Sequence, residues 1–385
     1  MSTLPDLAPI RAFLDERHLE FGRAIAAWAA RELGHREEPA DDAAGRAEAR
    51  SMVSELGAAG WFEPIRTGDW RGCCLAREAL AAASPLADAV FALQALGGLP
   101  LMLAGNEAMK SRWLDEALAG RAMGAFAMTE EGAGTDVAAL ATRARREGDF
   151  YVLDGRKAYI SNAGIADFYQ VFATTDPALG GKGIACFCVP ADTPGCRFVR
   201  PLVLSSPHPL GEIAFEDCRV PASHRLGDEG KGFALGLKTL DRLRPTVGAA
   251  ACGMAARALA EALAHARARR QFGKPIAEFQ LVQEKLARMA TDLTAARLLV
   301  YRAAWEADRG TARITMEAAM AKSFATEAAQ RIVDDAVQVL GGAGVIASHP
   351  VDRLYRSVRA LRIYEGTTEI QHLVIAGHLL ADASA

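Results

Sequence analysis

The sequence lacks any long uninterrupted run of apolar residues. No stretch of 18 or more apolar residues occurs among its 385 residues, so we expect no membrane-spanning segment. The first residues, MSTLPDLAPIRAFLDERHLEF, are polar and mixed in charge, without the basic start and apolar core that are typical of a signal peptide. These absences predict a protein of the reducing cytoplasm.

Strong net charge and clustered metal ligands are also missing. A formal net charge of -3 gives no electrostatic reason to expect a nucleic-acid partner. The seven cysteines are scattered, and no pair of CxxC units predicts a zinc site. Cys186 and Cys188 alternate within IACFCV, so we expect them to be buried structural thiols on one face of a strand. We therefore predict no metal.

The length exceeds what one hydrophobic core usually serves, and the texture of the chain changes twice. Residues 1–122 are rich in alanine, leucine, glutamate and arginine, which favours helices. Residues 123–237 contain short β-branched and aromatic runs broken by Gly, Pro, Asp and Asn, which is typical of strands and turns. Residues 238–385 are helical again. We predict an α+β multidomain fold in which helical domains flank a central antiparallel β domain.

Two local patterns give sharper expectations. Leu153-Asp154-Gly155 indicates a hairpin turn. The short loop Asp308-Arg309-Gly310 predicts two antiparallel neighbouring helices. Their apolar stripes are Val282, Leu286, Met289, Leu293, Ala296 and Val300 in the first helix, and Met320, Phe324, Ala328 and Ile332 in the second.

No GxxxxGK[ST] or GxGxxG phosphate loop is present, and the glycine-containing segments have another form. AFAMTEEGAGTD (125–136) is either an ordinary polar loop or a functional one. In GRKAYISNAG (155–164), alternation places Tyr159 and Ser161 on the same side of a strand. The two side chains could flank a flat heterocycle, or belong to an ordinary half-buried strand.

Two segments near helix ends have similar double interpretations. HARARRQFGKP (265–275) lies near the end of a helix that we expect to stop at Gly273. Its arginines either complement the negative helix terminus or bind phosphate. QVLGGAGV (338–345) ends another helix with paired glycines, which form a C-cap or let a pyrophosphate approach the backbone.

IYEGTTEIQHLVIAGHLL (363–380) is the most informative segment. Thr368 and Gln371 predict a capping box, with a final helix starting there and with Ile370, Leu373 and Val374 facing inward. Glu365 then lies just outside the helix, in a tight turn that Gly366 permits. Burial would raise the pKa of this carboxyl towards the value that a general base requires, whereas the helix N-terminus would lower it. The sequence leaves both outcomes open.

Taken together and in order, these segments resemble the acyl-CoA dehydrogenase family. AFAMTEEGAGTD is similar to AxxxTExxAGSD, GRKAYISNAG to GxKxWITNxx, and FEDCRVPASHRLGDEGKGF to FxDxxVPxxxxLGxxGxGF. ARRQFGKPIAEFQ is similar to RxQFGxxIxxxQ, QVLGGAGV to QxxGGxGY, and IYEGTTEIQ to IYEGTxEIQ. The resemblance implies an N-terminal helical domain, a central β domain, a C-terminal four-helix bundle, and FAD between the last two.

The resemblance also implies site residues. The positions that match cofactor contacts are Phe126, Met128, Thr129, Thr135, Tyr159, Ile160, Ser161, Arg269, Gln271, Phe272, Gln280, Gln338, Gly341, Gly342, Thr367 and Glu369. Those that match acyl-CoA contacts are Thr135, Asp241, Arg244, Tyr364 and Gly366. Among them, Ser161 resembles the hydroxyl that reaches flavin N5. Arg269, Gln271 and Phe272 match positions that hold the cofactor of a neighbouring subunit, as expected for a homotetramer built as a dimer of dimers.

The implied reaction is α,β-dehydrogenation of an acyl-CoA. Glu365 would take the α-proton while a β-hydride passes to flavin N5. A main-chain N–H, here that of Glu365, would help to hold the thioester oxygen as charge develops on it. Electrons would then pass to an electron-transfer flavoprotein. Some relatives carry the base just before the arginine of LDxxR, where this chain has the apolar Leu243.

Several positions depart from the family pattern. Tyr159 replaces a tryptophan, Val345 an aromatic residue, and Ser357 a common aspartate. LSSPHPLG (204–211) replaces the GxRxS passage near the substrate entrance, which favours an unusual acyl group: cyclic, branched or aromatic.

Two alternatives follow from the resemblance. The first is a flavin oxidase or monooxygenase on the same scaffold; monooxygenase relatives generally lack the glutamate of YEGT, and nitroalkane oxidases carry aspartate there. The second is a non-catalytic stress-response or assembly protein, which loss of the base or of the cofactor arginine would support. Glu365 and Arg269 are both present and favour the dehydrogenase.

Overall fold

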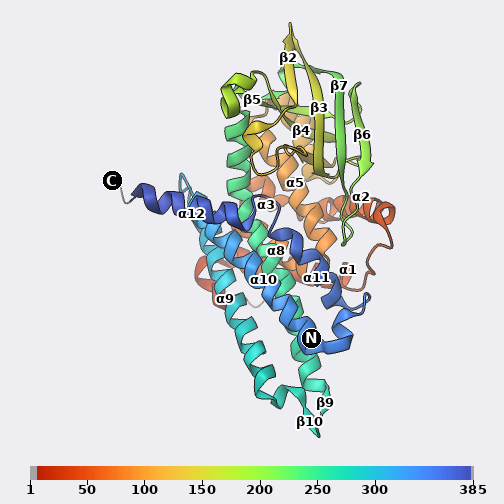
Figure 1. The fold of residues 1–385 in the computed structure, drawn as a ribbon, viewed down its shortest axis with the longest axis vertical. Coiled ribbons are helices and arrows are strands. Elements are labelled where there is room, and N and C mark those ends of the chain that lie inside the picture. The colour runs from red at the N-terminus through yellow and green to blue at the C-terminus, as the bar shows by residue number, and fades with distance from the viewer. Residues whose placement is uncertain (1–6, 383–385) are drawn as a thin grey trace. The chain divides into compact units, whose positions relative to one another are not determined.

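The computed structural model describes residues 7–382, which form two compact units (Figure 1). The first unit comprises the chain up to Glu38, Gly68–Asp88, and the chain from Asp241 onwards. The second comprises Pro39–Thr67 and Ala89–Leu240. The helical, β and helical textures of the sequence are confirmed in this order.

The first unit is helical. Its helices are α1 (Glu16–Glu32), α4 (Trp70–Ala83), α9 (Gln280–Asp308), α10 (Thr315–Leu340), α11 (Pro350–Leu361) and α12 (Thr368–Asp382), with most of α8 (Gly232–Ala268). A two-stranded hairpin, β9 (Arg270–Gln271) and β10 (Lys274–Pro275), joins α8 to α9. Short 3-10 helices lie at Ala8–Phe13, Ile276–Glu278 and Gly341–Val345.

Helices α8, α9 and α10 pack closely in this unit (Figure 1). The predicted stripe on α9 is buried from Met289 onwards, at Met289, Leu293, Ala296 and Val300, whereas Val282 and Leu286 are half-buried. Gly248 of α8 shows how near the helices come: a β-carbon there would lie 2.7 Å from Cγ2 of Val300. Helices α9 and α10 are neighbours, as the short connection predicted.

The second unit combines helices with a mixed sheet. Its helices are α2 (Asp42–Ala58), α3 (Glu63–Thr67), α6 (Glu107–Met109), α7 (Asp115–Leu118) and most of α5 (Pro85–Ala104), with a π-helical turn at Lys110–Leu114. Its strands are β1 (Gly124–Ala127), β2 (Arg143–Glu147), β3 (Phe150–Ser161), β4 (Phe168–Thr174), β5 (Ile184–Pro190), β6 (Cys196–Pro201), β7 (Leu210–Pro221) and β8 (Arg225–Leu226). Its 3-10 helices are Val137–Ala139, Pro177–Gly183 and Ala222–His224.

The eight strands follow the order β6-β7-β3-β2-β4-β5-β8, with β1 added alongside β4. Most pairs are antiparallel, but β4 pairs in parallel with both β1 and β2. The hairpin turn predicted at Leu153-Asp154-Gly155 is wrong: β3 runs through it, and the chain turns earlier, between Glu147 and Phe150. The glycine instead marks a bulge, where the register between β3 and β7 shifts.

Two helices, α5 and α8, are long and apolar enough to pass a membrane-span test by composition. Most of each apolar window is buried within the protein, 83% in α5 and 67% in α8, as in core helices of water-soluble domains. The cysteine expectation is confirmed: Cys186 and Cys188 are buried in β5, and burial raises the pKa of both thiols.

A buried charged cluster joins α4 to α9. Nε of Arg297 donates to Glu78 at 2.7 Å, and the hydroxyl of Tyr301 donates to the same carboxylate at 2.9 Å. All three side chains are at most 5% exposed. Such a cluster depends on every partner, because removing one leaves a buried charge without compensation.

We therefore predict that Arg297→Met lowers the free energy of unfolding by about 3–5 kcal/mol, since Glu78 loses its cation. Urea denaturation followed by circular dichroism measures the change. The matched control is Arg331→Met, because Arg331 forms an exposed pair with Asp292 and should contribute less than about 1 kcal/mol. Equal losses in the two variants would contradict the structural role of the cluster.

Candidate active site

Glu365 lies in a tight turn between α11 and α12, as predicted. Its own φ is 55° and that of Gly366 is 93°, so two successive residues adopt left-handed backbone conformations. Glycine is required at the second position, because a β-carbon there would lie 2.5 Å from Nε2 of Gln371. A non-glycine residue with positive φ costs conformational free energy, so the surrounding contacts must hold Glu365 in place.

Three buried side chains hold this turn by its carbonyl groups. Nε of Arg244 donates to the carbonyl oxygen of Glu365 at 3.1 Å. The carbonyl oxygen of Gly366 accepts from Nζ of Lys322 at 2.7 Å and from Nε2 of Gln371 at 3.0 Å. The main-chain N–H of Glu365, in contrast, has no hydrogen-bond partner among the described residues. The turn thus directs its acceptors into the protein and leaves one donor available.

Helix α12 begins at Thr368 as predicted, but the capping box is wrong. Thr367 acts as the cap and accepts from the N–H of Ile370, while Thr368 donates to Glu327. Gln371 turns to the carbonyls of the Glu365 turn, which a helix cap would not allow. Of the three residues predicted to face inward, Leu373 is 67% exposed, whereas Ile370 and Val374 are half-buried.

The carboxyl group of Glu365 is removed from water. Its Oε2 atom is buried and finds no hydrogen-bond partner among the described residues. Burial raises the pKa of this carboxyl, and this effect outweighs the opposing influence of Arg77, Arg244 and Lys322. The two effects that the sequence left open are therefore decided in favour of burial.

A second buried ion pair lies behind this carboxyl. Arg77 of α4 donates to both carboxylate oxygens of Asp88, at 2.7 and 3.0 Å, and to the hydroxyl of Thr246 at 3.0 Å. After burial, the charge of Arg77 is the largest influence on the pKa of Glu365, which it lowers. The pair keeps a positive charge near the carboxylate while Asp88 offsets much of it.

Of the predicted substrate residues, Asp241, Arg244 and Tyr364 belong to the same unit as Glu365, whereas Thr135 does not. Asp241 and Arg244 form an ion pair at 2.6 Å, and the hydroxyl of Thr315 donates to Asp241 at 2.8 Å. Tyr364 is 39% exposed and borders the turn directly. Thr135, in contrast, belongs to the other unit and is exposed there.

In the second unit, the segment after β1 is fixed to β3 by a buried lysine. Nζ of Lys157 lies 2.7 Å from Glu130 and donates to the carbonyl oxygen of Met128 at 3.1 Å. Burial lowers the pKa of Lys157 to about 8, although Glu130 opposes the shift. The main chain adds a further bond, from the N–H of Ala158 to the carbonyl oxygen of Thr129. These contacts place the two predicted flavin segments side by side.

The end of β3 does not follow the simple alternation that the sequence predicted. Tyr159 has a φ of 56° and is 58% exposed, and the register with β7 shifts between Lys157 and Ile160. Ser161 is half-buried and Ile160 is buried. Met128 is also buried, whereas Phe126 and Thr129 are half-buried. Tyr159 and Ser161 are thus the accessible side chains of this strand end.

The remaining predicted cofactor residues lie at the hairpin end of the bundle. Helix α8 ends at Ala268, five residues before the predicted Gly273, because Phe272 and Gly273 turn with φ of 52° and 83° to form the β9–β10 hairpin. Phe272 is 93% exposed. Arg269, Gln271, Gln280 and Gln338 are exposed as well. Helix α10 ends at Leu340 with Gly341 at φ 59°, which confirms the predicted glycine C-cap.

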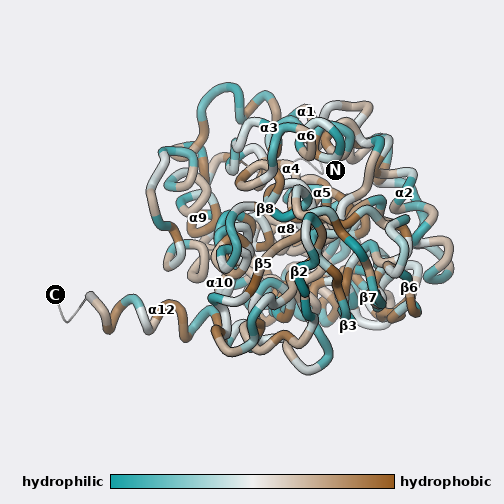
Figure 2. Tube along the Cα trace, turned by 90° about the horizontal axis from the view of Figure 1, so that it is seen from above, coloured by the Kyte–Doolittle hydropathy of each residue, from teal (hydrophilic) through white to brown (hydrophobic). Residues whose placement is uncertain are grey.

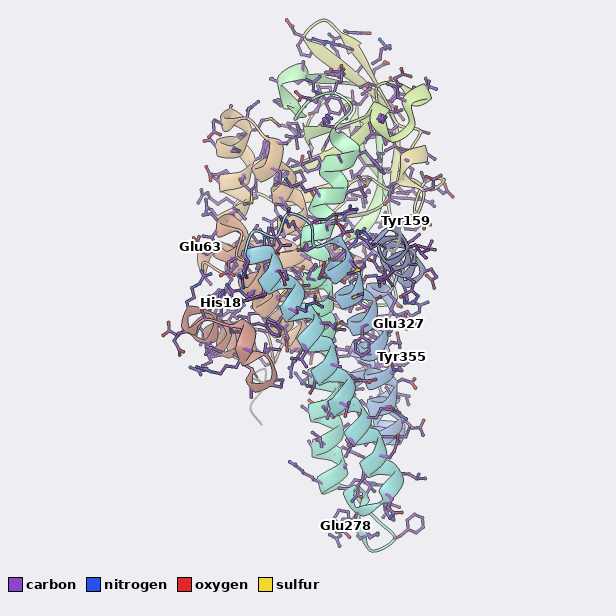
Figure 3. All side chains as sticks on the ribbon, turned by 90° about the vertical axis from the view of Figure 1, so that its left-hand side faces the viewer. His18, Glu63, Tyr159, Glu278, Glu327 and Tyr355 are labelled. Atoms are coloured by element: carbon purple, nitrogen blue, oxygen red, sulfur yellow. The ribbon has the colours of Figure 1, made fainter. Side chains whose placement is uncertain are left out.

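These residues do not gather around Glu365 within the unit. Lys322, which contacts the turn of Glu365, is separated from Leu340 by about 27 Å along α10, at about 1.5 Å per residue. In Figure 3, Glu327 of α10 and Glu278 at the hairpin end lie far apart along the helical bundle. Thr367 and Glu369, in contrast, flank the start of α12 beside Glu365.

The hairpin end is suited to a phosphate-bearing ligand. A β-carbon at Gly341 or Gly342 would meet no atom within 4 Å, so the backbone there is open to a close approach. Arg269 forms no ion pair with any described residue. Open glycine backbone at the end of α10 and an arginine without an ion pair after the end of α8 both fit a phosphate-bearing ligand such as a dinucleotide.

The chain matches the three domain models of the acyl-CoA dehydrogenase family: the N-terminal domain over residues 15–121, the middle domain over 125–218 and the C-terminal domain over 230–380. It therefore belongs to this family of FAD-dependent oxidoreductases. A 3-(aryl)acrylate reductase of Clostridium sporogenes is 46% identical over 74% of this chain and 75% of its own.

Solved structures agree with the family assignment. Butyryl-CoA dehydrogenase from Megasphaera elsdenii matches with a TM-score of 0.89 and 35% identity, over 95% of this chain and 99% of its own. A structure described as the electron transferring flavoprotein of Acidaminococcus fermentans, in work on electron bifurcation, matches with a TM-score of 0.86 and 34% identity, over 95% and 98%.

Sequence reasoning missed the residues that hold the site from behind. Lys322 and Arg77 are interior helix residues whose contacts come from distant parts of the chain, so no local pattern marks them. Gln371 was expected in a capping box, but its bond to the carbonyl oxygen of Gly366 was not predicted. His208, which contacts Ser161, lies in the loop that departs from the family pattern. The replacement of the family's GxRxS passage by LSSPHPLG was the sequence signal that could have drawn attention to His208.

We predict that Arg269→Ala lowers the FAD content of the purified protein, because an unpaired cation at the hairpin end is lost. The ratio of flavin to protein absorbance measures the occupancy. Arg267→Ala is the matched control, since Arg267 is an exposed arginine of the same helix end that lies outside the matched motif. Full occupancy in Arg269→Ala would remove this residue from the cofactor site.

Proposed function

We propose that this protein catalyses the α,β-dehydrogenation of an acyl-CoA thioester to the 2-enoyl-CoA, with Glu365 as the base. The observation that carries the proposal is a buried carboxyl group with a raised pKa, presented in a strained turn. A carboxylate in water is too weak a base for a thioester α-proton. Removal from water and fixed orientation increase its reactivity towards that proton.

The proposed step leaves one proton on the protein. Glu365 takes the α-proton and becomes a neutral carboxylic acid, which its dry surroundings favour. FAD supplies the oxidation when bound, taking the β-hydrogen with its electron pair. The substrate thereby loses two hydrogens and gains a carbon–carbon double bond.

The same turn offers a donor for the thioester oxygen. The N–H of Glu365 has no partner among the described residues, whereas the neighbouring carbonyls are held by Arg244, Lys322 and Gln371. A fixed donor stabilises negative charge that develops on the thioester oxygen without having to reorient. Base and donor thus come from one residue whose backbone is locked.

We further propose that the hairpin end serves the FAD of a second copy of the chain, in a homotetramer arranged as a dimer of dimers. Arg269, Gln271 and Phe272 are exposed and distant from Glu365 within their own unit. Helix α12 also exposes apolar side chains, with Leu373 at 67% and Leu380 at 71%. Figure 2 shows that hydrophobic residues recur along the trace of this helix. Such surfaces are typical of subunit interfaces.

The acyl group that we propose is small or ring-bearing. The similar proteins are named for an aryl acrylate and for butyryl-CoA, and the loop 204–211 departs from the family pattern near the substrate entrance. The similarity to a reductase favours a second candidate function, in which the same residues reduce an enoyl thioester. The direction follows from the electron partner, because base and donor serve both directions equally.

As the electron partner we propose an electron-transfer flavoprotein, supported by the name of one similar structure. A cytoplasmic location is consistent with the two apolar helices being core elements. An oxidase or monooxygenase is less well supported, because Glu365 is present at the position where monooxygenase relatives generally lack a glutamate and nitroalkane oxidases carry aspartate. A non-catalytic role is opposed by the FAD-binding family and the intact site.

The deciding experiment is an anaerobic titration of the purified holoprotein with straight-chain, cyclic and aryl-substituted acyl-CoAs, observed at the oxidised flavin band. We expect one saturated thioester to bleach the band. Bleaching restricted to external reductants, with reoxidation by an enoyl-CoA, would establish the reductase direction. A flavin that responds to neither class of thioester would contradict the proposed function.

We predict that Glu365→Gln keeps bound FAD but abolishes flavin reduction by substrate, because glutamine accepts no proton. Burial raises the folded-state pKa of Glu365, so the ionised carboxylate is less stable in the fold than in the unfolded chain. The neutral variant should therefore melt at the same or a higher temperature. An unchanged rate of flavin bleaching would remove Glu365 from its role.

The pH dependence follows from the same shift. The base acts only when deprotonated, so flavin reduction should fall as the pH drops through the raised pKa of Glu365. Lys322→Met removes a cation that lowers this pKa, so the low-pH limb of the rate profile (the acid limb) should move to higher pH. The turn should persist in this variant, because Gln371 still donates to the carbonyl oxygen of Gly366. Lys285→Met, which loses only a partly exposed pair with Asp335, should leave the limb in place. If the acid limbs of the wild type, Lys322→Met and Lys285→Met coincide, the assignment of this limb to Glu365 is contradicted.

A further inference from the structure

The loop 204–211, which departs from the family pattern, carries a histidine between two prolines, Pro207-His208-Pro209. Proline fixes its own φ and restricts the residue before it, so the backbone of His208 has few alternatives. A side chain on such a segment is oriented with little loss of conformational entropy. The loop therefore presents the imidazole in a defined position.

Hydrogen bonds on the C-terminal side of His208 fasten the loop to the end of β3. The N–H of Asn162 donates to the carbonyl oxygen of Pro209 at 2.8 Å. Arg46 of α2 donates to the carbonyl oxygens of Leu210 and Ala163, at 2.6 and 2.5 Å. One arginine thus joins the loop to the segment that follows Ser161.

This anchoring brings Nε2 of His208 to 2.7 Å from Oγ of Ser161. Two charged groups face the imidazole, Arg46 and Asp42. Burial and, next, the charge of Arg46 lower the pKa of His208 to about 4, against the opposing effect of Asp42. The imidazole is therefore neutral near pH 7, and a neutral imidazole has one ring nitrogen that accepts a hydrogen bond.

By the family resemblance, Ser161 matches the hydroxyl that reaches flavin N5, and one hydroxyl group has only one proton to donate. N5 accepts a hydrogen bond in oxidised FAD and carries a hydrogen in reduced FAD. The hydroxyl must therefore change from donor to acceptor towards N5, and its own proton then needs another acceptor. Within the described part of the chain, Nε2 of His208 is the side-chain atom bonded to this hydroxyl.

We propose that His208 is a positioning residue for Ser161: its Nε2 accepts the hydroxyl proton of Ser161 and turns the lone pairs of Oγ towards N5, which favours the reduced cofactor. This inference rests on the proposed FAD-dependent function and on the family resemblance that places flavin N5 beside Ser161. It adds a determinant of the flavin potential that comes from the loop 204–211, and it gives the loop a role other than contact with the acyl group.

The test is a double-mutant cycle on the FAD-bound protein, with His208→Ala, Ser161→Ala and the double variant. The midpoint potential is measured by anaerobic chemical reduction against a reference dye, without acyl-CoA. We expect His208→Ala to disfavour two-electron reduction by about tenfold, which is about 30 mV. In the Ser161→Ala background the same change should have no effect, because the hydroxyl that it acts on is gone.

The matched control is His224→Ala. His224 is a partly buried histidine of the same unit whose pKa is also lowered, but its ring bonds to the carbonyl oxygen of Cys188. Its replacement should leave the potential unchanged. If His208→Ala does not retain FAD, His208→Asn supplies an amide acceptor of smaller size and should retain most of the wild-type potential.

An unchanged or raised potential in His208→Ala would overturn the proposal, as would an equal decrease with and without the Ser161 hydroxyl. These outcomes are separate from failure of the proposed function. A protein whose flavin no thioester bleaches or reoxidises contradicts the dehydrogenase and reductase assignments, yet its potential still reports on His208. A protein that reacts with thioesters but lacks the coupling contradicts only the role of His208.

Discussion

The site depends on one constraint: a carboxyl group kept out of water on a turn that its own conformation does not favour. Glu365 and Gly366 both have positive φ, and their carbonyls are held by Arg244, Lys322 and Gln371. Each of these side chains is itself buried, so the carbonyl groups of the turn are held from the interior of the protein. Strain of this kind persists only where the surrounding structure enforces it.

The cost of this arrangement is distributed over the helical unit. Burying a carboxylate is unfavourable, and the positive charges of Arg77, Arg244 and Lys322 compensate it only in part. Arg77 is in turn neutralised by Asp88, which prevents the cations from suppressing the basicity of Glu365 altogether. A carboxyl with a raised pKa therefore requires a balance among buried charges rather than the absence of charge.

The β unit contributes a different kind of positioning. Lys157 and Glu130 hold the segment after β1 against β3 from the inside, and Arg46 holds the loop 204–211 against the end of β3. Tyr159 and Ser161 are left accessible at this strand end because a bulge interrupts the alternation. The His208–Ser161 contact links a loop outside the family pattern to the accessible end of β3.

The sequence alone determined the order of the domains, the apolar stripe of α9, the glycine C-cap of α10 and the turn at Glu365, because each depends on neighbouring residues. The sequence misplaced a hairpin at Asp154-Gly155, where β3 instead contains a bulge. It also misplaced the helix cap at Thr368, because the hydroxyl of Thr368 donates to the distant Glu327 rather than capping the helix. Only the tertiary structure decided the pKa of Glu365 and the partners of Lys322, Arg77 and His208. Desolvation and long-range hydrogen bonds depend on residues that meet in space but lie far apart in the chain.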